Sequence, residues 1–258
     1  MELEAKLVEK QRIRQHFHKV LDCYDDHAWI QQKINRRLLS YIMASLPTCS
    51  LENVLELGCG TGQLSKQLQQ HIHANYWMFN DLCDVKDRLK KKLSQPFEFH
   101  CGDAEQFSFK RTYDLIVSAS AVQWFHHQAS FIEHCKKGLS RDGLLAIATF
   151  GQENLYEIRA LTNIGLIYPS LSDWKAWLQD DFELLYAEIT TEELFFPTPL
   201  DVLKHLKQTG VTATGQGTWT KQKLHTFIEQ YQRYFSLPSQ QQVRLTYQPL
   251  WIVARYKR

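Results

Sequence analysis

The chain has 258 residues, 44% of them hydrophobic and 22% charged, a composition that excludes a disordered protein. This length suits one large α/β domain, or one domain that carries a cap, better than two full domains. A formal net charge of +2 excludes the strongly basic character typical of nucleic-acid binders. The six cysteines have no metal-ligand spacing, and residues 1–25 contain no apolar run long enough for a signal peptide or a membrane span. We therefore expect a cytoplasmic protein with reduced thiols and no metal site.

The predicted elements fall into zones along the chain. Residues 1–47 are expected to be helical with an apolar face, although periodicity alone does not set the role of this zone. Residues 53–150 alternate short β-rich runs with helical segments. We predict strands at 53–57, 75–80, 97–101, 113–118 and 143–150, and helices at about 62–71, 84–93 and 130–138. The last of these helices is expected to begin with a capping box of Ser130 and Glu133. This alternation predicts an α/β fold with a mostly parallel sheet.

The remaining residues are expected to add a cap and a final strand to the same single domain. Residues 151–242 contain a probable late strand at 182–190 and helical segments at about 199–208 and 220–235. Residues 243–258 contain the final strand, predicted at 243–255. Helices inserted between late strands suit a cap over the carboxyl edge of the sheet.

The strongest local signal is a strand that runs directly into three glycines spaced two apart, Gly58, Gly60 and Gly62. Glycine lets the backbone approach a ligand closely, and the helix that follows offers free N–H groups to an anion. Position 63 is Gln63, so the dinucleotide pattern G-x-G-x-x-G is absent, and no Gly-Lys-Ser or Gly-Lys-Thr follows as in a P-loop. We expect an amino-acid carboxylate at this helix end and Glu56 near an α-ammonium group; a simple strand-to-helix turn is the alternative.

Two further carboxylates follow the next strands of the predicted sheet. Asp81 comes after the apolar run 76–79, and Asp103 directly follows the segment 97–102. Carboxylates at the carboxyl ends of parallel strands share one edge of the sheet. There Asp81 could accept hydrogen bonds from ribose hydroxyls, and Asp103 could accept one from an adenine amino group. A helix N-cap or turn is the alternative for Asp81.

These motifs, together with the segment 113–118, resemble the ordered motifs of Rossmann-like methyltransferases that use S-adenosylmethionine, over about residues 53–150. A narrower resemblance, along nearly the whole chain, is to the malonyl-acyl-carrier-protein O-methyltransferases of biotin synthesis. Its matching segments are 17–25 with His27, Ala28 and Gln31, then 120–125, 149–151, 154–155 and 205–213. One departure is Ala119, where many relatives are expected to have Asn.

The resemblance implies a mostly parallel seven-stranded sheet flanked by helices, with N-terminal helices and a helical cap between late strands. It implies S-adenosylmethionine as cofactor, with S-adenosylhomocysteine as product, and methylation of the free carboxylate of a malonyl group carried by an acyl carrier protein or by coenzyme A. A carboxylate has an ordinary pKa of about 4 and is already ionised at neutral pH, so positioning rather than a catalytic base should carry the rate.

The resemblance also implies the site residues. Tyr24 and Gln31 are expected to close over the methionine end of the cofactor, with helix packing as the alternative. Gln123 and Trp124 follow the fourth strand, where the substrate should approach, and with Tyr24 they are the positioning candidates; core packing is the alternative for Trp124. The full expected cofactor set is Tyr24, Gln31, Glu56, Gly58, Gly60, Gly62, Asp81, Leu82, Asp103, Ala104, Ser118 and Gln123.

Partners of the substrate are harder to assign. An arginine fork could meet the malonyl carboxylate, but the sequence does not rank Arg36, Arg37, Arg159, Arg233 and Arg244. Because acyl carrier proteins are acidic, we expect a docking surface at lysines of the cap, namely Lys204, Lys207, Lys221 and Lys223. Two other functions stay open: a small-acid carboxyl methyltransferase of the trans-aconitate type, and a non-catalytic scaffold that binds adenosylmethionine.

Overall fold

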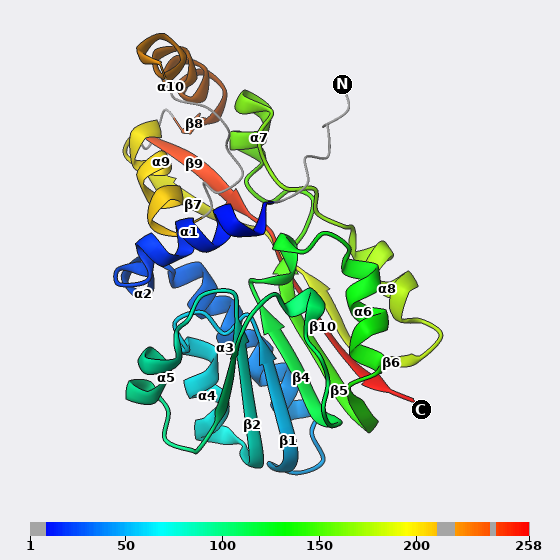
Figure 1. The fold of residues 1–258 in the computed structure, drawn as a ribbon. Helices are drawn as coiled ribbons and strands as arrows, with labels where there is room; N and C mark the ends of the chain where they lie inside the picture. The colour runs from blue at the N-terminus through cyan, green and yellow to red at the C-terminus, as the bar shows by residue number, and fades with distance from the viewer. Residues whose placement is uncertain (1–8, 211–219, 238–240, 258) are drawn as a thin grey trace.

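The computed structural model describes residues 9–210, 220–237 and 241–257, and its main element is a seven-stranded sheet (Figure 1). The strand order is β3-β2-β1-β4-β5-β10-β6. The first five strands in this order pair in parallel, and β10 is antiparallel to both of its neighbours. Their bounds are β1 Ser50–Leu57, β2 His73–Asp81, β3 Glu98–Cys101, β4 Tyr113–Ala119, β5 Leu139–Phe150, β6 Phe182–Ile189 and β10 Pro249–Tyr256. The mostly parallel α/β sheet predicted from the sequence is confirmed.

Helices cover both faces of this sheet because its central strands are apolar on both sides. In β4, Leu115 and Val117 point into one buried cluster and Ile116 into the other. The first cluster includes residues of α3 (Trp29–Ser45), α4 (Gln63–His71) and α5 (Lys86–Lys92). The second includes residues of α6 (Gln128–Lys136) and α8 (Leu171–Leu178). The sheet is thereby the middle layer of a three-layer arrangement.

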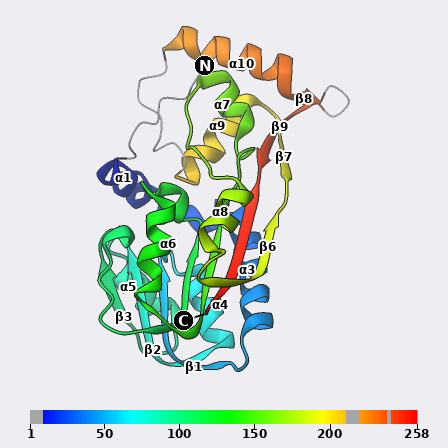
Figure 2. The ribbon, with the colours of Figure 1, turned by 90° about the vertical axis from the view of Figure 1, so that its right-hand side faces the viewer.

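The cap is built on a second, smaller sheet. Its order is β7-β9-β8, with β7 Glu192–Phe196, β8 Ser236–Leu237 and β9 Gln242–Tyr247. With α7 (Tyr156–Thr162), α9 (Pro199–Gln208) and α10 (Lys221–Phe235), it lies above the main sheet in the orientation of Figures 1 and 2. The first helix, α1 (Lys10–Val20), lies between the cap and the main sheet, and α2 (Tyr24–His27) joins it to α3.

Several predicted details are wrong. The final strand predicted at 243–255 is two strands, β9 and β10, which belong to different sheets and are separated at Gln248. Residues 243–255 are extended and apolar as predicted, but within this run the chain passes from the cap sheet to the main sheet. A pattern of alternation does not show which strands a segment pairs with. The capping box of Ser130 and Glu133 is also wrong: α6 begins at Gln128, and the box is instead at the start of α8, between Ser170 and Asp173.

Within the described residues, no helix combines the length and the apolar character needed to cross a lipid bilayer.

Candidate functional site

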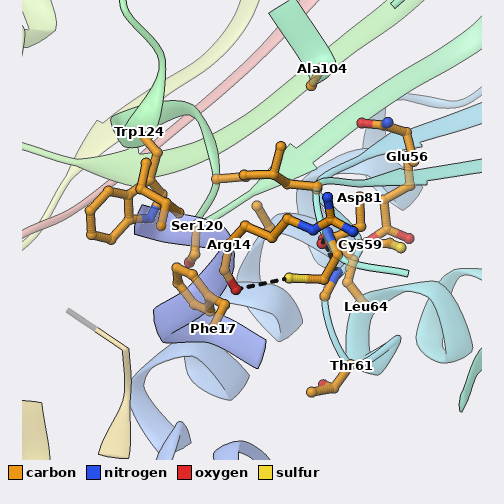
Figure 3. A pocket seen from close by; sticks show the side chains of 18 of the residues that line it. Arg14, Phe17, Glu56, Cys59, Thr61, Leu64, Asp81, Ala104, Ser120 and Trp124 are labelled. Carbon is orange, nitrogen blue, oxygen red and sulfur yellow. Dashed lines mark hydrogen bonds between the residues drawn. The ribbon is translucent and has the colours of Figure 1, made fainter. Parts of the chain in front are cut away.

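A cavity of about 1030 Å³, counted with its open mouth, lies between the carboxyl edge of the main sheet and α1 (Figure 3). The strand ends supply Glu56, Gly58, Asp81 and neighbouring residues, and α1 supplies Ile13, Arg14 and Phe17. In Figure 3, Glu56 and Asp81 lie on one side of the cavity, and Trp124 and Ser120 lie on the other. The cavity therefore occupies the edge at which the sequence places its acidic residues.

The glycine loop forms one wall of this cavity. All three glycines have left-handed φ angles: +75° at Gly58, +53° at Gly60 and +80° at Gly62. A Cβ atom at Gly58 would lie 2.4 Å from the Cβ atom of Ala121, so a side chain there would collide with the loop after β4. A Cβ atom at Gly60 would meet no atom within 4 Å, because Gly60 faces the open cavity. The loop is thus shaped to leave space at Gly60.

Asp81 holds the glycine loop and the next turn in place. Its carboxylate accepts hydrogen bonds from the backbone N–H of Gly60, at 2.8 Å, and of Cys83, also at 2.8 Å. Burial raises its pKa, and the hydrogen bonds from backbone N–H groups partly offset this effect. Asp81 lines the cavity, and its second role as a turn residue, the alternative considered from the sequence, is also present.

Glu56 is a buried acid at the end of β1. Its side chain is 2% exposed, and the Oγ atom of Ser65 donates a hydrogen bond of 2.6 Å to its Oε2 atom. Burial raises the pKa of Glu56 to about 8, although the hydrogen bond from Ser65 acts in the opposite direction. At neutral pH this carboxyl group is largely protonated, and a cation brought beside it would favour its ionised form.

Asp103 has a partner that sequence reasoning missed. Its Oδ1 atom lies 3.2 Å from Nζ of Lys10 and accepts a hydrogen bond of 3.1 Å from the backbone N–H of Glu105. Lys10 also pairs with Glu105 at 2.7 Å and lies 4.8 Å from the centre of the Phe125 ring. Lys10 thereby links α1 to the turn after β3, at the mouth of the cavity.

A second contact ties the N-terminal cover to the glycine loop. Asp25 accepts a hydrogen bond of 2.6 Å from Oγ1 of Thr61, and its other carboxylate oxygen lies 2.5 Å from Nζ of Lys92. Tyr24 and Gln31, on the same cover, both line the cavity, and burial raises the pKa of the Tyr24 phenol. The cover therefore closes the cavity opposite the sheet.

A smaller inner chamber, about 380 Å³ with its opening, adjoins the main cavity. Among the described residues, five line both spaces: Phe17, Tyr24, Gln31, Ser120 and Trp124. The inner chamber alone is lined by Gln123, Phe150, Asn154, Leu155, Leu166, Tyr168, Thr209 and Tyr247. Its described walls include no Lys, Arg, His, Asp or Glu. The molecule thus offers a larger space with acidic groups joined to a smaller one without charged side chains.

Most of the residues expected from the sequence line the main cavity, and three do not. Gly62 is the N-cap residue before α4, and a Cβ atom there would lie 2.6 Å from Cδ2 of Leu89. Ser118 is fully buried and donates a hydrogen bond of 2.7 Å to the carbonyl of Leu57. Gln123 lines the inner chamber, where its Nε2 atom donates to the carbonyl of Ser120 at 2.7 Å. The residues expected from the sequence that line the main cavity are Tyr24, Gln31, Glu56, Gly58, Gly60, Asp81, Leu82, Asp103, Ala104 and Trp124.

None of the five arginines considered for the substrate carboxylate lines either space among the described residues. Arg37 pairs with Glu188, and Arg244 with Glu157 and Glu193. Arg14, which sequence reasoning did not consider, lies on the cavity wall instead. It could have been found only by knowing that α1 folds over the sheet edge. The matching segment 211–213 lies outside the described residues.

Comparisons with known proteins agree with this geometry. A family model described as "Methyltransferase domain" matches residues 55–147. A malonyl-acyl-carrier-protein O-methyltransferase from Haemophilus influenzae is 58% identical over 249 residues, which is 96% of this chain and 95% of the relative. A protein of the same name from Porphyromonas gingivalis is 40% identical, over 98% of both chains.

Solved structures share the fold. The structure of a protein from Bacillus halodurans described as a putative methyltransferase matches 84% of this chain and 97% of its own, with a TM-score of 0.63 and 17% identity. The N-methyltransferase NodS of Bradyrhizobium japonicum, solved with S-adenosylhomocysteine, matches 96% of this chain and all of its own, with a TM-score of 0.59 and 14% identity. The Rossmann-like methyltransferase fold is therefore confirmed, and the identity to full-length relatives shows that the chain belongs to the malonyl-acyl-carrier-protein O-methyltransferase family.

Proposed function

We propose that this protein transfers the methyl group of S-adenosylmethionine to the free carboxylate of a malonyl group carried by an acyl carrier protein, which forms the methyl ester at an early step of biotin synthesis. The relatives that share its whole length carry this activity in their names. The observation in this chain that carries the proposal is the meeting of two spaces at Ser120 and Trp124. One space suits a nucleoside with an amino-acid end, and the other suits a short acyl group.

The main cavity fits the cofactor in three places. Gly60 leaves space that any side chain would fill, so a ligand can lie against the loop backbone. Glu56 is a buried acid that a ligand's α-ammonium group would stabilise in its ionised form. The Oδ1 atom of Asn80, also on the wall, is buried without a hydrogen-bond partner in the described part of the chain and can accept a hydrogen bond from a ligand.

When bound, the cofactor supplies an electrophilic methyl group, and the protein's task is to position an acid that is already ionised. An unperturbed carboxylic acid has a pKa of about 4, so no base has to remove a proton at neutral pH. Tyr24, Ser120 and Trp124 lie on both spaces and are the groups that can align the two reactants. Holding reactants in an in-line geometry is itself a large catalytic effect.

Cap lysines give a docking surface for an acidic carrier. Lys204 and Lys207 lie on α9, and Lys221 and Lys223 lie at the start of α10. All four are exposed, and none forms an ion pair with an acid among the described residues. Thr209, at the end of α9, lines the inner chamber, so α9 runs from this surface to the acyl space.

The test is methyl transfer from radiolabelled S-adenosylmethionine to a panel of acceptors. We expect label on malonyl carrier, with malonyl coenzyme A as a second acceptor, and little on carriers that bear acetyl groups. Transfer to free trans-aconitate but not to malonyl carrier would favour a small-acid carboxyl methyltransferase. Cofactor binding without transfer to any acid would leave only the scaffold function.

A further inference from the structure

Two buried hydrogen-bond donors at the junction of the cavity and the inner chamber have no hydrogen-bond partner among the residues that the structure describes. They are Nε1 of Trp124, whose side chain is 6% exposed, and Oγ of Ser120. Both residues line both spaces. Buried polar groups in folded proteins are nearly always paired, because leaving one unpaired costs folding free energy. These two donors therefore point to a ligand that accepts hydrogen bonds.

The backbone around Ser120 is held in an uncommon conformation. Its φ angle is +54°, in the left-handed region that a non-glycine residue rarely adopts. The backbone N–H of Ser120 donates a hydrogen bond of 2.8 Å to the carbonyl of Ala148, and its carbonyl accepts one of 2.7 Å from Nε2 of Gln123. Thr149 in turn donates to Oε1 of Gln123 at 3.4 Å. These bonds fix the position of the Ser120 hydroxyl group.

The indole of Trp124 is equally constrained. It packs edge-on against the ring of Phe17 from α1, with ring centres 5.8 Å apart and an angle of 89° between the planes. Trp124 ends the short 3₁₀ turn Val122–Trp124, so the fold of the loop after β4 and the closure of α1 together set the direction of the N–H group. Figure 3 shows Trp124, Ser120 and Phe17 together on one side of the cavity.

The inner chamber beside these donors is neutral. Burial raises the pKa of Tyr168 to about 12 and also raises that of Tyr247, so both phenols keep their protons. Behind Tyr247, burial lowers the pKa of His205 to about 4, so the imidazole is uncharged at neutral pH. No cation among the described chamber residues can neutralise a bound carboxylate.

We propose that the inner chamber is the carboxylate subsite, in which Trp124 Nε1 and Ser120 Oγ donate hydrogen bonds to the malonyl carboxylate and orient it without neutralising its charge. This inference rests on the proposed function and adds to it the groups that select the substrate. In the transfer, a carboxylate oxygen forms a bond to the methyl carbon, the carbon–sulfur bond breaks, and its electron pair stays on sulfur; no proton moves. The negative charge of the carboxylate and the positive charge of the sulfonium group are both lost as the methyl group moves.

The absence of a cation has a catalytic reason. A fixed arginine or lysine would stabilise the ionised substrate more than the less charged transition state, and it would raise the barrier. Neutral donors align the oxygen and lose less interaction as its charge falls. They also provide selectivity, because the ester product is a weaker hydrogen-bond acceptor than the carboxylate.

The direct test follows the indole N–H resonances of protein labelled with ¹⁵N at tryptophan, and Trp124→Phe assigns the relevant one. S-adenosylhomocysteine is added first, then a malonyl pantetheine analogue in which a methylene group replaces the thioester sulfur. We expect the Trp124 resonance to move downfield with the acid and much less with its methyl ester. An unmoved resonance while calorimetry records binding of the acid, or equal shifts with acid and ester, would overturn the proposal.

Trp174 provides a matched control. Its indole is fully buried, and its Nε1 atom also lacks a hydrogen-bond partner within the described ranges. The side chain packs in the core on the other face of the sheet and lines neither space. Trp124→Phe and Ser120→Ala are each expected to lower kcat/KM for malonyl carrier ~10–100-fold, the usual range for one hydrogen bond to a charged group. The affinity for S-adenosylhomocysteine should change little, and Trp174→Phe should leave both quantities unchanged.

Methyl transfer and the carboxylate subsite can be tested separately. If the wild-type protein transfers no methyl group to malonyl carrier, the proposed function fails. If it does so and Trp124→Phe is as active as Trp174→Phe, the proposed function stands and the subsite assignment is wrong.

Discussion

Substitution of Gly60 by alanine separates cofactor binding from folding. The φ angle of +53° makes any L side chain costly, by about 1–2 kcal/mol, but the added Cβ atom meets nothing in the protein. For a domain of this size, each kcal/mol lowers Tm by roughly 2–4 °C, so Gly60→Ala should reduce Tm by only a few degrees. The methyl group would instead project into the cavity, where overpacking against a ligand costs about 1–3 kcal/mol.

This cost corresponds to a rise of ~10–100-fold in the Kd for S-adenosylhomocysteine, which titration calorimetry measures directly. Gly62→Ala is the matched control, since Gly62 also has a left-handed φ but lies off the cavity wall, and its Cβ atom would collide with Leu89 at 2.6 Å. It should lose more thermal stability than Gly60→Ala and keep the wild-type Kd at temperatures where it is folded. Tight binding by Gly60→Ala, or weak binding by a folded Gly62→Ala protein, would refute the assignment of the loop.

Three further predictions concern charge. At pH 6.5 the wild-type protein should release protons on binding S-adenosylhomocysteine, because burial raises the pKa of Glu56 to about 8 and the ligand's ammonium group would lower that pKa. Calorimetry in buffers of different ionisation enthalpy measures the release, and an unchanged release in Glu56→Gln would contradict this assignment. Burial lowers the pKa of His205 to about 4, so the unfolded chain binds a proton that the folded protein refuses, and the unfolding free energy should fall as the pH drops from 6.5 to 4. This loss of unfolding free energy is at most about 3 kcal/mol and should be smaller in His205→Gln. Urea unfolding at both pH values measures it, and equal losses in the two proteins would exclude His205 as the cause. Lys204→Glu and Lys207→Glu should each raise the KM for malonyl carrier ~3–10-fold and leave the KM for malonyl pantetheine unchanged. Lys91→Glu on α5 should change neither KM. Equal effects on both substrates would show that these lysines do not form a docking surface.

The sheet and its acidic edge were predictable because the signals are local. The apolar runs that end in Gly58, Asp81 and Asp103 each contain their own strand and turn, and parallel strands bring their ends to one edge whatever lies elsewhere in the chain. The cover by the N-terminal helices was predicted only through the family resemblance. Its contact from Lys10 to Asp103 joins residues that are 93 positions apart, and no periodicity reveals such a pair.

The division of the site into two spaces could not be predicted. It depends on how the loop after β4, the end of β5 and the residues from α9 to β9 meet around Tyr24 and Trp124. Long-range pairing also explains the wrong final strand. The run 243–255 looks continuous in the sequence, although its two halves pair with different strands. Likewise, the sequence offered several arginines for the substrate, and their pairing with acids such as Glu188 and Glu157 appears only in the folded protein.

Malonyl carrier with ¹⁸O in both oxygens of the free carboxylate shows whether that carboxylate is the group that attacks the methyl carbon. After incubation with S-adenosylmethionine, mass spectrometry of the acyl group should show a methyl ester that retains both labelled oxygens, because the carboxylate attacks the methyl carbon and its own carbon–oxygen bonds stay intact. Loss of a labelled oxygen from the ester, or a methyl group attached to carbon, would exclude attack by the carboxylate.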